Sequence, residues 1–457
     1  MSVTASRFGS SPLLFDWSGL APHLKEISPE TRATLGAAWD KTKAKLHDRV
    51  SGFYDCPVEP TLSQVDACET LAKKLISESK YKDCVFIGIG GSSLGPMCLI
   101  DSLKHLATNP IQFHFFENPD PIDWSYRIAK LNPAQTLVCV VTKSGTTYET
   151  LSIFMLAFDW LKKSLGEDGA ISQTVAITDP EKSELLDFAR EKNINTLFIS
   201  SSVGGRYSVF TPVGLFAAAL AGLDTQKFIL GAKKIRDYCE KHSSQSEKNS
   251  FIYLANALQS LNQSNPIHVM MPYSTPIRLV ANWWVQLWAE SLGKNGKGFT
   301  AVPSLGAVDQ HSMLQLLRDG PNDKIIWFIN VQDFEKKITI PNVGFKSKTF
   351  DLLEKQDLGT LLNTEFRAIQ KVMINQKRPN LQLQLDSINE ESIGAIFFYF
   401  CVLTAFMGEV MNVNPFDQPG VEEGKIYIQD NLKKQKEAAL APSSGEDEVH
   451  RLRLGRE

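Results

Sequence analysis

Two junctions of similar composition limit the folds that this chain can adopt. Each begins with an apolar run typical of a buried strand, continues directly into glycine, serine and threonine, and ends in a helical pattern; they occupy residues 85–96 and 137–150. Such a junction gathers backbone N–H groups at the start of a helix, where an anion can bind. The hydroxyl side chains add neutral donors, so a phosphate monoester could be held without a metal ion. The sequence therefore predicts strand–helix units around a site for a small phosphorylated molecule.

The series of short apolar runs along the chain predicts two sheets. The first five runs alternate with helical stretches and lie at residues 84–88, 112–116, 136–141, 174–178 and 196–200. This alternation is typical of βαβ units, in which helices cover both faces of a parallel sheet. A second series begins near residue 250, with strands predicted at 267–271, 325–331 and 381–385. We therefore expect an α/β fold with two sheets of similar kind.

Two nucleotide-binding loops have a spacing similar to that of the first junction. Gly90 and Gly95 are spaced as in a Walker loop, but the next two residues are proline and methionine, where lysine and serine or threonine would be needed. This excludes a Walker loop. Residues 88–93 match the dinucleotide-binding pattern only in part, because Ser93 stands in place of the third glycine, although Glu117 could replace the ribose-binding acid. A nicotinamide-dependent oxidoreductase therefore remains an alternative.

The composition is that of a globular protein with room for two or three domains, since 43% of its 457 residues are hydrophobic and 22% are charged. The net charge of −3, without a basic block, argues against nucleic-acid binding. The seven cysteines are widely spaced and form no cluster with histidine, which indicates a reducing compartment and no metal site. The first fifteen residues lack the pattern of a secretory signal, so we expect a cytoplasmic protein.

One long apolar stretch needs an explanation of its own. Residues 393–407 are almost wholly apolar, but they are fewer than the roughly 20 that cross a bilayer. Glu391 and Glu409 flank the stretch. We therefore predict a fully buried helix or a subunit interface, and no membrane association.

Glu290 is a candidate general base. We expect it on a helix over residues 277–292, with Thr275 as the N-cap and Gly293 after its end. Gln286 lies four residues earlier and shares its face, so an amide and a carboxylate can point at one ligand. Three tryptophans on the same helix would form an apolar wall that raises the pKa of the carboxyl group toward neutrality. The alternative is a solvated glutamate near the end of a helix.

Three further polar residues are candidates for catalysis, each with a structural alternative. His311 would lie in the first turn of a helix capped by Asp309, where the helix dipole favours a neutral ring; a lone histidine can also be purely structural. Arg206 follows two glycines and could stabilise an oxyanion, or it could form a surface ion pair. Lys425 opens the last helix after a Pro-Gly turn, and its alternative is a simple exposed lysine.

The second junction is unusually rich in donors. Residues 142–147 contain four hydroxyl groups and one lysine. Serine and threonine are favoured at helix starts in any case, so an ordinary capped helix is the alternative to a phosphate site. The number of donors exceeds what one cap requires, and phosphate binding is our interpretation.

Several motifs, taken together and in order, resemble the glucose-6-phosphate isomerase (phosphoglucose isomerase) family, in its bacterial form. They are Gly-Ile-Gly-Gly-Ser-Ser-Leu-Gly-Pro, Lys-Ser-Gly-Thr-Thr-Tyr-Glu-Thr, Gly-Gly-Arg-Tyr-Ser-Val, Ala-Glu-Ser-Leu-Gly-Lys, Asp-Gln-His-Ser and Gln-Pro-Gly-Val-Glu-Glu-Gly-Lys, beginning at residues 88, 143, 204, 289, 309 and 418. The resemblance implies two sugar-isomerase (SIS) αβα subdomains, a homodimer and no cofactor. It also implies the interconversion of glucose 6-phosphate and fructose 6-phosphate through a cis-enediol, a step of glycolysis and gluconeogenesis. A non-catalytic sugar-phosphate-binding protein of the same fold is the alternative.

The resemblance also implies a role for each residue of the site. Glu290 would be the base, Arg206 would face the enediol oxygens, and His311 and Lys425 would serve ring opening, with His311 supplied by the neighbouring subunit. The substrate-binding residues would be Gly91, Ser92, Thr142, Lys143, Ser144, Gly145, Thr146, Thr147, Gln286 and Gln418. The sequence departs from the vertebrate pattern at Ser93, where aspartate is usual, and at residues 144–145, which leaves the preference between glucose and mannose phosphates open.

The expected domain organisation has four parts. Residues 1–45 form an N-terminal helical extension, and residues 46–235 the first SIS subdomain with the phosphate site. Residues 236–440 form the second SIS subdomain with the C-terminal helices. The polar, aperiodic residues 441–457 are expected to be a mobile tail.

Overall fold

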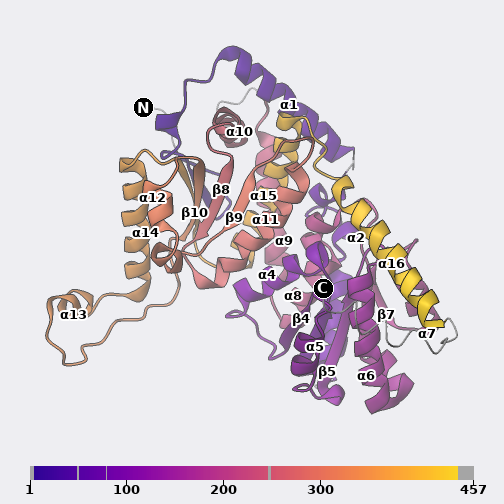
Figure 1. Cartoon of the computed structure of the whole chain (residues 1–457). Coiled ribbons are helices and arrows are strands. Elements are labelled where there is room, and N and C mark those ends of the chain that lie inside the picture. Colours follow the sequence, from indigo (N-terminus) through magenta and orange to yellow (C-terminus); the bar gives the residue numbers. More distant parts are fainter. Residues whose placement is uncertain (1–4, 49–50, 79, 245–248, 441–457) are drawn as a thin grey trace, which may run out of the picture. The chain divides into compact units, whose positions relative to one another are not determined.

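The computed structural model describes residues 5–48, 51–78, 80–244 and 249–440 (Figure 1). The chain divides after Phe416 into two compact units. The first unit carries both sheets, and the described part of the second consists of η8 (Pro419–Val421) and α16 (Glu422–Leu440). The tail predicted to be mobile lies outside the described residues.

The first sheet has five parallel strands in the order β4-β3-β5-β6-β7. They are β3 (Asp83–Ile87), β4 (Gln112–Phe116), β5 (Thr136–Val141), β6 (Thr174–Thr178) and β7 (Asn195–Phe198). All five predicted strands are confirmed, with ends that differ by at most two residues. The chain leaves β3 toward β4 on one side and returns to β5 on the other. A ligand crevice is therefore expected between the carboxyl ends of β3 and β5, which the two donor-rich junctions follow.

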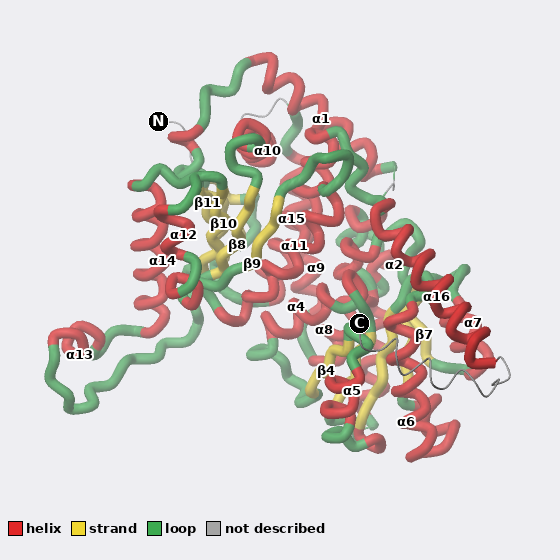
Figure 2. Tube along the Cα trace, viewed as in Figure 1, coloured by secondary structure: helices red, strands yellow, loops and turns green. Residues whose placement is uncertain are grey.

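The second sheet has six strands in the order β1-β2-β11-β10-β8-β9. Figure 2 labels its strands β11, β10, β8 and β9. The six strands are β1 (Ala5–Arg7), β2 (Leu13–Asp16), β8 (Ile267–Pro272), β9 (Thr300–Pro303), β10 (Lys324–Val331) and β11 (Asn380–Leu385). The last four are parallel, and β2 joins β11 in antiparallel fashion. The α/β class with two mainly parallel sheets is thus confirmed.

The N-terminal region differs from the helical extension that the sequence suggested. It does contain α1 (Pro29–His47), but β1 and β2 precede this helix and extend the second sheet at one edge. β1 has three residues, is only partly buried and shows no apolar run, and the apolar run of β2, residues 13–15, is only three residues long. The domain boundaries expected from the sequence stay a prediction.

The long apolar stretch forms the middle of α15 (Glu390–Met411). By length and composition α15 could span a membrane, but 89% of its apolar window is buried in the protein. It packs on α9 (Thr225–Lys241) so closely that a Cβ atom at Gly394 would lie 1.9 Å from the carbonyl oxygen of Phe228. The prediction of a fully buried helix is confirmed, and a subunit interface along α15 is wrong, because this chain already covers its apolar side chains.

The remaining helices connect the strands or cover the sheets. Those that follow strands of the first sheet are α4 (Leu94–Leu103), α5 (Pro121–Ile128), α6 (Tyr148–Ser172), α7 (Glu184–Lys192) and α8 (Pro212–Ala221). The others are α2 (Pro60–Ser63), α3 (Val65–Ser77), α10 (Ser250–Leu261), α11 (Arg278–Leu292), α12 (Leu314–Asp319), α13 (Lys348–Leu353) and α14 (Leu358–Asn375). Of these, α11 packs against α4 and α15 and so joins the second sheet to the ligand edge of the first.

Candidate active site

The loop after β3 brings the other parts of the site together through glycine contacts. It forms the short helix η3 (Gly90–Ser92). A Cβ atom at Gly91 would lie 2.2 Å from the carbonyl carbon of Gly205, so only glycine allows the backbone before Arg206 to come this close. Gly90 has φ +58°, and a Cβ atom there would lie 2.9 Å from Nε2 of Gln286. The glycine-rich loop therefore touches both the Arg206 segment and α11.

Arg206 is a buried anchor. It lies in η5 (Gly205–Phe210), and only 2% of its side chain is exposed. Its Nε donates to Oγ of Ser291 at 2.7 Å, and its Nη2 donates to the carbonyl oxygen of Pro415 at 2.6 Å. The alternative of a surface ion pair is therefore wrong. A buried guanidinium needs an anionic partner, and Glu290 supplies it.

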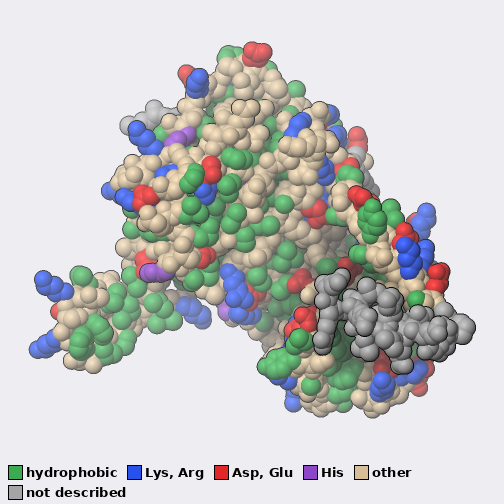
Figure 3. Space-filling view, viewed as in Figure 1, with side chains coloured by type: hydrophobic (Ala, Val, Ile, Leu, Met, Phe, Trp, Pro, Cys, Tyr) green, Lys and Arg blue, Asp and Glu red, His purple; other side chains and the backbone are tan. Residues whose placement is uncertain are grey.

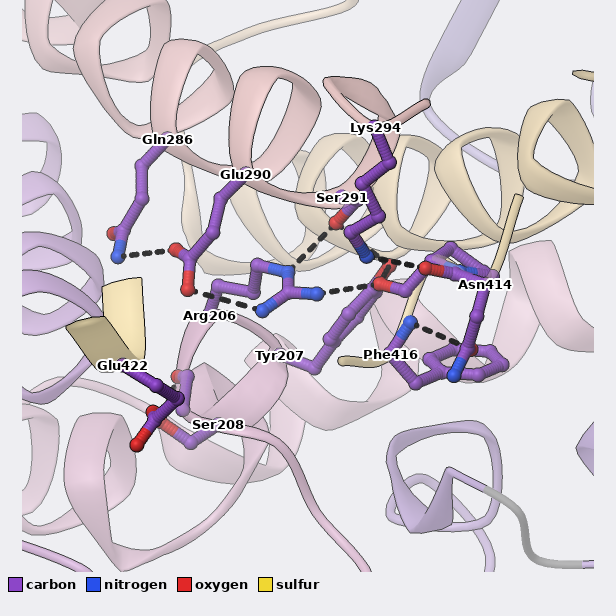
Figure 4. Close-up of polar contacts among 12 residues, drawn as sticks. Arg206, Tyr207, Ser208, Gln286, Glu290, Ser291, Lys294, Asn414, Phe416 and Glu422 are labelled. Atoms are coloured by element: carbon purple, nitrogen blue, oxygen red, sulfur yellow. Dashed lines mark hydrogen bonds and ion pairs between the residues drawn. The ribbon is translucent and has the colours of Figure 1, made fainter. Parts of the chain in front are cut away.

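Glu290 lies on α11 with its carboxylate between two donors (Figure 4). Nη1 of Arg206 donates to Oε1 at 3.1 Å, and Nε2 of Gln286 donates to Oε2 at 3.1 Å. The predicted pairing of Gln286 with Glu290 on one helix face is confirmed. Because 28% of the Glu290 side chain is exposed, a substrate can reach the carboxylate.

Two details of the expected α11 are wrong. Its start is not capped by Thr275, because a short helix, η6 (Thr275–Ile277), precedes α11 and has Ser274 at its N-cap without a side-chain hydrogen bond. The expected wall of three tryptophans around the carboxylate does not form either, and Trp283 packs on Phe397 of α15. Trp284 and Trp288 stack on one another and pack on Trp327 of β10. Polar partners, rather than an indole wall, hold Glu290.

The donor-rich loop after β5 is not an ordinary capped helix start. Thr147 occupies the N-cap position of α6, but its side chain makes no capping hydrogen bond. Its hydroxyl instead pairs with the hydroxyl of Thr142 at 3.1 Å. The backbone N–H and hydroxyl of Thr146 both donate to Oγ of Ser144. The N–H groups at the start of α6 are thus left for another acceptor.

The loop after β6 holds the donor-rich loop in place. The hydroxyl of Thr178 donates to the carbonyl oxygen of Thr142 at 2.7 Å and pairs with Ser183 at 2.5 Å. Gly145 has φ +67°, and a Cβ atom there would lie 2.1 Å from Oγ of Ser183. The turn at Gly145 is therefore possible only for glycine. Lys143, expected at the phosphate, directs its ammonium group toward the loop after β7 instead.

The side chain of His311 makes no hydrogen bond to Glu290 or to any other residue of the described chain. His311 is exposed and ends the short helix η7 (Val308–His311), which follows β9. The expected cap is wrong, because Ala307 holds the N-cap position and Asp309 lies inside the helix. Although partial burial opposes it, hydrogen bonds from Ser312, from the Leu305 backbone and from Ser304 lower the pKa of Asp309.

Gln418 and Lys425 belong to the second unit. Gln418 directly precedes η8, and Lys425 lies in the first turn of α16, so the predicted Pro-Gly turn followed by a helix is confirmed. The ammonium group of Lys425 donates to Glu422 at 2.7 Å. Their contact with a substrate stays a prediction.

Three groups around Arg206 were not found by sequence reasoning. The hydroxyl of Ser291 receives the Arg206 Nε–H and also pairs with the Tyr207 hydroxyl at 3.2 Å. The carbonyl oxygen of Pro415 accepts from both Arg206 and Tyr207. Tyr207 and Ser291 directly follow Arg206 and Glu290 in the sequence, so they could have been inferred from these neighbours. The carbonyl group of Pro415 could not, because it lies 209 residues from Arg206.

The chain is similar to known proteins over most of its length. The phosphoglucose isomerase family model matches residues 65–447. A glucose-6-phosphate isomerase of Rubrobacter xylanophilus is 38% identical over 88% of this chain and 92% of its own length, and one of Carboxydothermus hydrogenoformans is 33% identical over 86% of both. A protein of Thermus thermophilus, described as hypothetical, has 32% identity and a TM-score of 0.84 over 92% of this chain and 99% of its own. A glucose-6-phosphate isomerase of Chlamydia trachomatis shares the fold, with a TM-score of 0.74, 19% identity and coverage of 98% and 92%.

Proposed function

This chain belongs to the phosphoglucose isomerase family, and we propose that Glu290 and Arg206 carry out its reaction. As a member, it is an aldose–ketose isomerase that interconverts glucose 6-phosphate and fructose 6-phosphate. The residue assignment rests on one observation above all. The Glu290 carboxylate is accessible, paired with a buried guanidinium, and held next to the glycine loop through Gln286.

The reaction needs a base that serves two adjacent carbons. A proton leaves the carbon next to the aldehyde, and the same proton or another returns one carbon over. Each oxygen of Glu290 accepts one hydrogen bond, so a lone pair remains on each for the substrate proton. Such positioned acid–base catalysis contributes about 100- to 10,000-fold in rate. Arg206 would stabilise the negative charge on the enediolate oxygen.

The loops after β3 and β5 would hold the substrate phosphate. Ser92 lies in the first loop, and the second offers the hydroxyls of residues 142–147 together with the open N–H groups of α6. Binding at a phosphate remote from the reacting carbons supplies free energy for orienting the sugar. A sugar without phosphate should therefore lose rate as well as affinity.

The assignment is tested by the Glu290→Gln variant. The amide keeps the size of the side chain and can still accept from Arg206, but it cannot remove a proton. We expect the rate of ketose formation, followed by NMR in deuterated water, to fall about 100- to 10,000-fold. Glu30→Gln, at an exposed glutamate of α1, is the control that should match the wild type. An undiminished rate in Glu290→Gln would remove this residue from the chemistry.

We further propose that the active form is a cytoplasmic homodimer. Residues 335–357, the α13 arm, extend away from the rest of the first unit (Figure 1) and carry hydrophobic side chains on their surface (Figure 3). Five of them are between 45% and 74% exposed, namely Ile338, Val343, Phe345, Phe350 and Leu352. Exposed apolar side chains of this number are typical of an interaction surface, and a second copy would cover them. The seven cysteines are all free and buried, in agreement with a reducing compartment.

In this dimer, His311 would act in ring opening at the active site of the partner, together with Lys425. The exposure of its side chain, which makes no hydrogen bond within the described chain, supports this assignment. The test mixes inactive His311→Ala and Glu290→Gln subunits after reversible dissociation. If each site takes its histidine from the partner, half of the dimers are mixed and one of their two sites is intact, so about a quarter of wild-type activity should return. A mixture of dimers that recovers no activity would refute a shared site.

A further inference from the structure

The ammonium group of Lys143 is held by two backbone carbonyl groups. It donates to the carbonyl oxygen of Ser201 at 2.7 Å and to that of Val203 at 2.9 Å. Both carbonyls belong to the segment after β7, whereas Lys143 belongs to the loop after β5. Two of the three donors of the ammonium group are thus used to join two loops. Burial lowers the pKa of Lys143, and the negative charge of Asp179 partly opposes this.

The segment that Lys143 holds leads directly into Arg206. Val203 is fully buried and three residues ahead of Arg206, and Gly204 is the N-cap of η5. Two residues after Val203, the backbone of Gly205 lies against Gly91, where an added Cβ atom would come within 2.2 Å of the Gly205 carbonyl carbon. The Arg206 backbone is therefore fixed from two directions, by the contact with the β3 loop and by the Lys143 bridge from the β5 loop.

We propose that Lys143 is a positioning residue that couples the phosphate-binding loop to the catalytic guanidinium. This inference rests on the proposed function of that loop and of Arg206. When a phosphate orders residues 142–147, the position of Lys143 is fixed with them, and its two hydrogen bonds fix the segment 201–203. Arg206 is then held in register with Glu290 while the enediolate forms. Phosphate binding is in this way converted into rate, without contact between the Lys143 ammonium group and the phosphate.

The Lys143→Met variant tests the coupling, because it keeps most of the unbranched side chain and removes both hydrogen bonds. We expect kcat with fructose 6-phosphate to fall about 10- to 100-fold, as small displacements of catalytic groups do. The inhibition constant of inorganic phosphate should change by less than about threefold, since only a distant charge is lost. Lys143→Arg can donate to both carbonyls and should restore at least part of kcat. Lys182→Met, at an exposed lysine after β6, removes the same charge and should leave kcat unchanged.

Three results would overturn the inference. A large rise in the inhibition constant of phosphate with an unchanged kcat would make Lys143 a phosphate ligand. A kcat equal to that of Lys182→Met would show that the bridge has no effect. A lower melting temperature with normal kcat per folded molecule would make the bridge purely structural. Each result differs from failure of the proposed function, which would appear as an inactive wild type or an active Glu290→Gln variant.

Discussion

One buried histidine should make the fold sensitive to acid. His268 of β8 is fully buried, stacks on Phe299 at 4.2 Å between ring centres, and lies within 6.0 Å of the rings of Trp288 and Trp327. Neither ring nitrogen has a hydrogen-bond partner in the described part of the chain. Burial lowers the pKa of His268 to about 3. The folded protein therefore holds this ring neutral throughout the ordinary pH range.

The sign and size of the effect follow from linkage. In the unfolded chain a histidine has a pKa of about 6.5, so below that pH the unfolded state binds a proton that the folded state does not. Above pH 6.5 the ring is mainly neutral in both states, and the free energy of unfolding has its full value. This free energy decreases as the pH falls from 6.5 toward 3. At about 1.4 kcal/mol for each pH unit, the free energy of unfolding should fall by about 2 kcal/mol between pH 6.5 and 5 through this group alone.

The His268→Phe variant should remove this part of the pH dependence. Phenylalanine fits an aromatic cluster and has no proton to bind, and it also removes a buried polar group that costs about 1–3 kcal/mol when unpaired. We expect the free energy of unfolding of the variant to be at least as large as that of the wild type at pH 7. At pH 5 the advantage of the variant over the wild type should be about 2 kcal/mol larger than at pH 7. Urea unfolding at pH 7, 6 and 5 measures this, with His311→Phe, at an exposed histidine, as the control. Equal pH slopes for wild type and His268→Phe would refute the reasoning.

Three further predictions concern the active site. If Arg206 stabilises the enediolate as proposed, its replacement by methionine removes a positioned cation and should lower kcat, measured as ketose formation, about 100- to 1,000-fold. Thr147→Val should raise the inhibition constant of inorganic phosphate several-fold but leave the melting temperature almost unchanged, since this hydroxyl caps no helix; a collapse in stability would favour capping. Gly91→Ala should abolish most activity in a kinetic assay, because its Cβ would displace the segment before Arg206; normal kcat would contradict this.

The sequence was sufficient for those strands whose surroundings are uniformly apolar. β5 and β6 are buried along their whole length, so they read as continuous apolar runs. β9 is only partly buried or exposed at every position and was missed for that reason. Uniform burial makes a strand easy to find, but it is not required, because the partly buried edge strands β4 and β7 of the first sheet were also predicted.

Some contacts of the candidate site could also be predicted from the sequence, and others could not. Gln286 and Glu290 are four residues apart on one helix, so their hydrogen bond could be predicted from helix geometry alone. The pairing of Arg206 with Glu290 spans 84 residues and depends on the close approach of Gly91 to Gly205, which no local pattern encodes. The prediction of a tryptophan wall beside Glu290 was wrong because spacing along a helix does not show which element a side chain packs on. Trp284 and Trp288 pack on Trp327 of β10.

The contact between Arg206 and Glu290 explains how a buried charge can take part in this reaction. The guanidinium is almost fully buried and is paired with the carboxylate before any substrate is present. In the proposed reaction, Glu290 becomes neutral when it removes a proton, and a negative charge appears on the substrate oxygen in the same step. The positive charge of Arg206 can then shift its interaction from the carboxylate to the enediolate, so the site holds one positive and one negative charge throughout. Because an unpaired buried charge costs several kcal/mol, this conservation of charge keeps the site electrostatically balanced along the reaction.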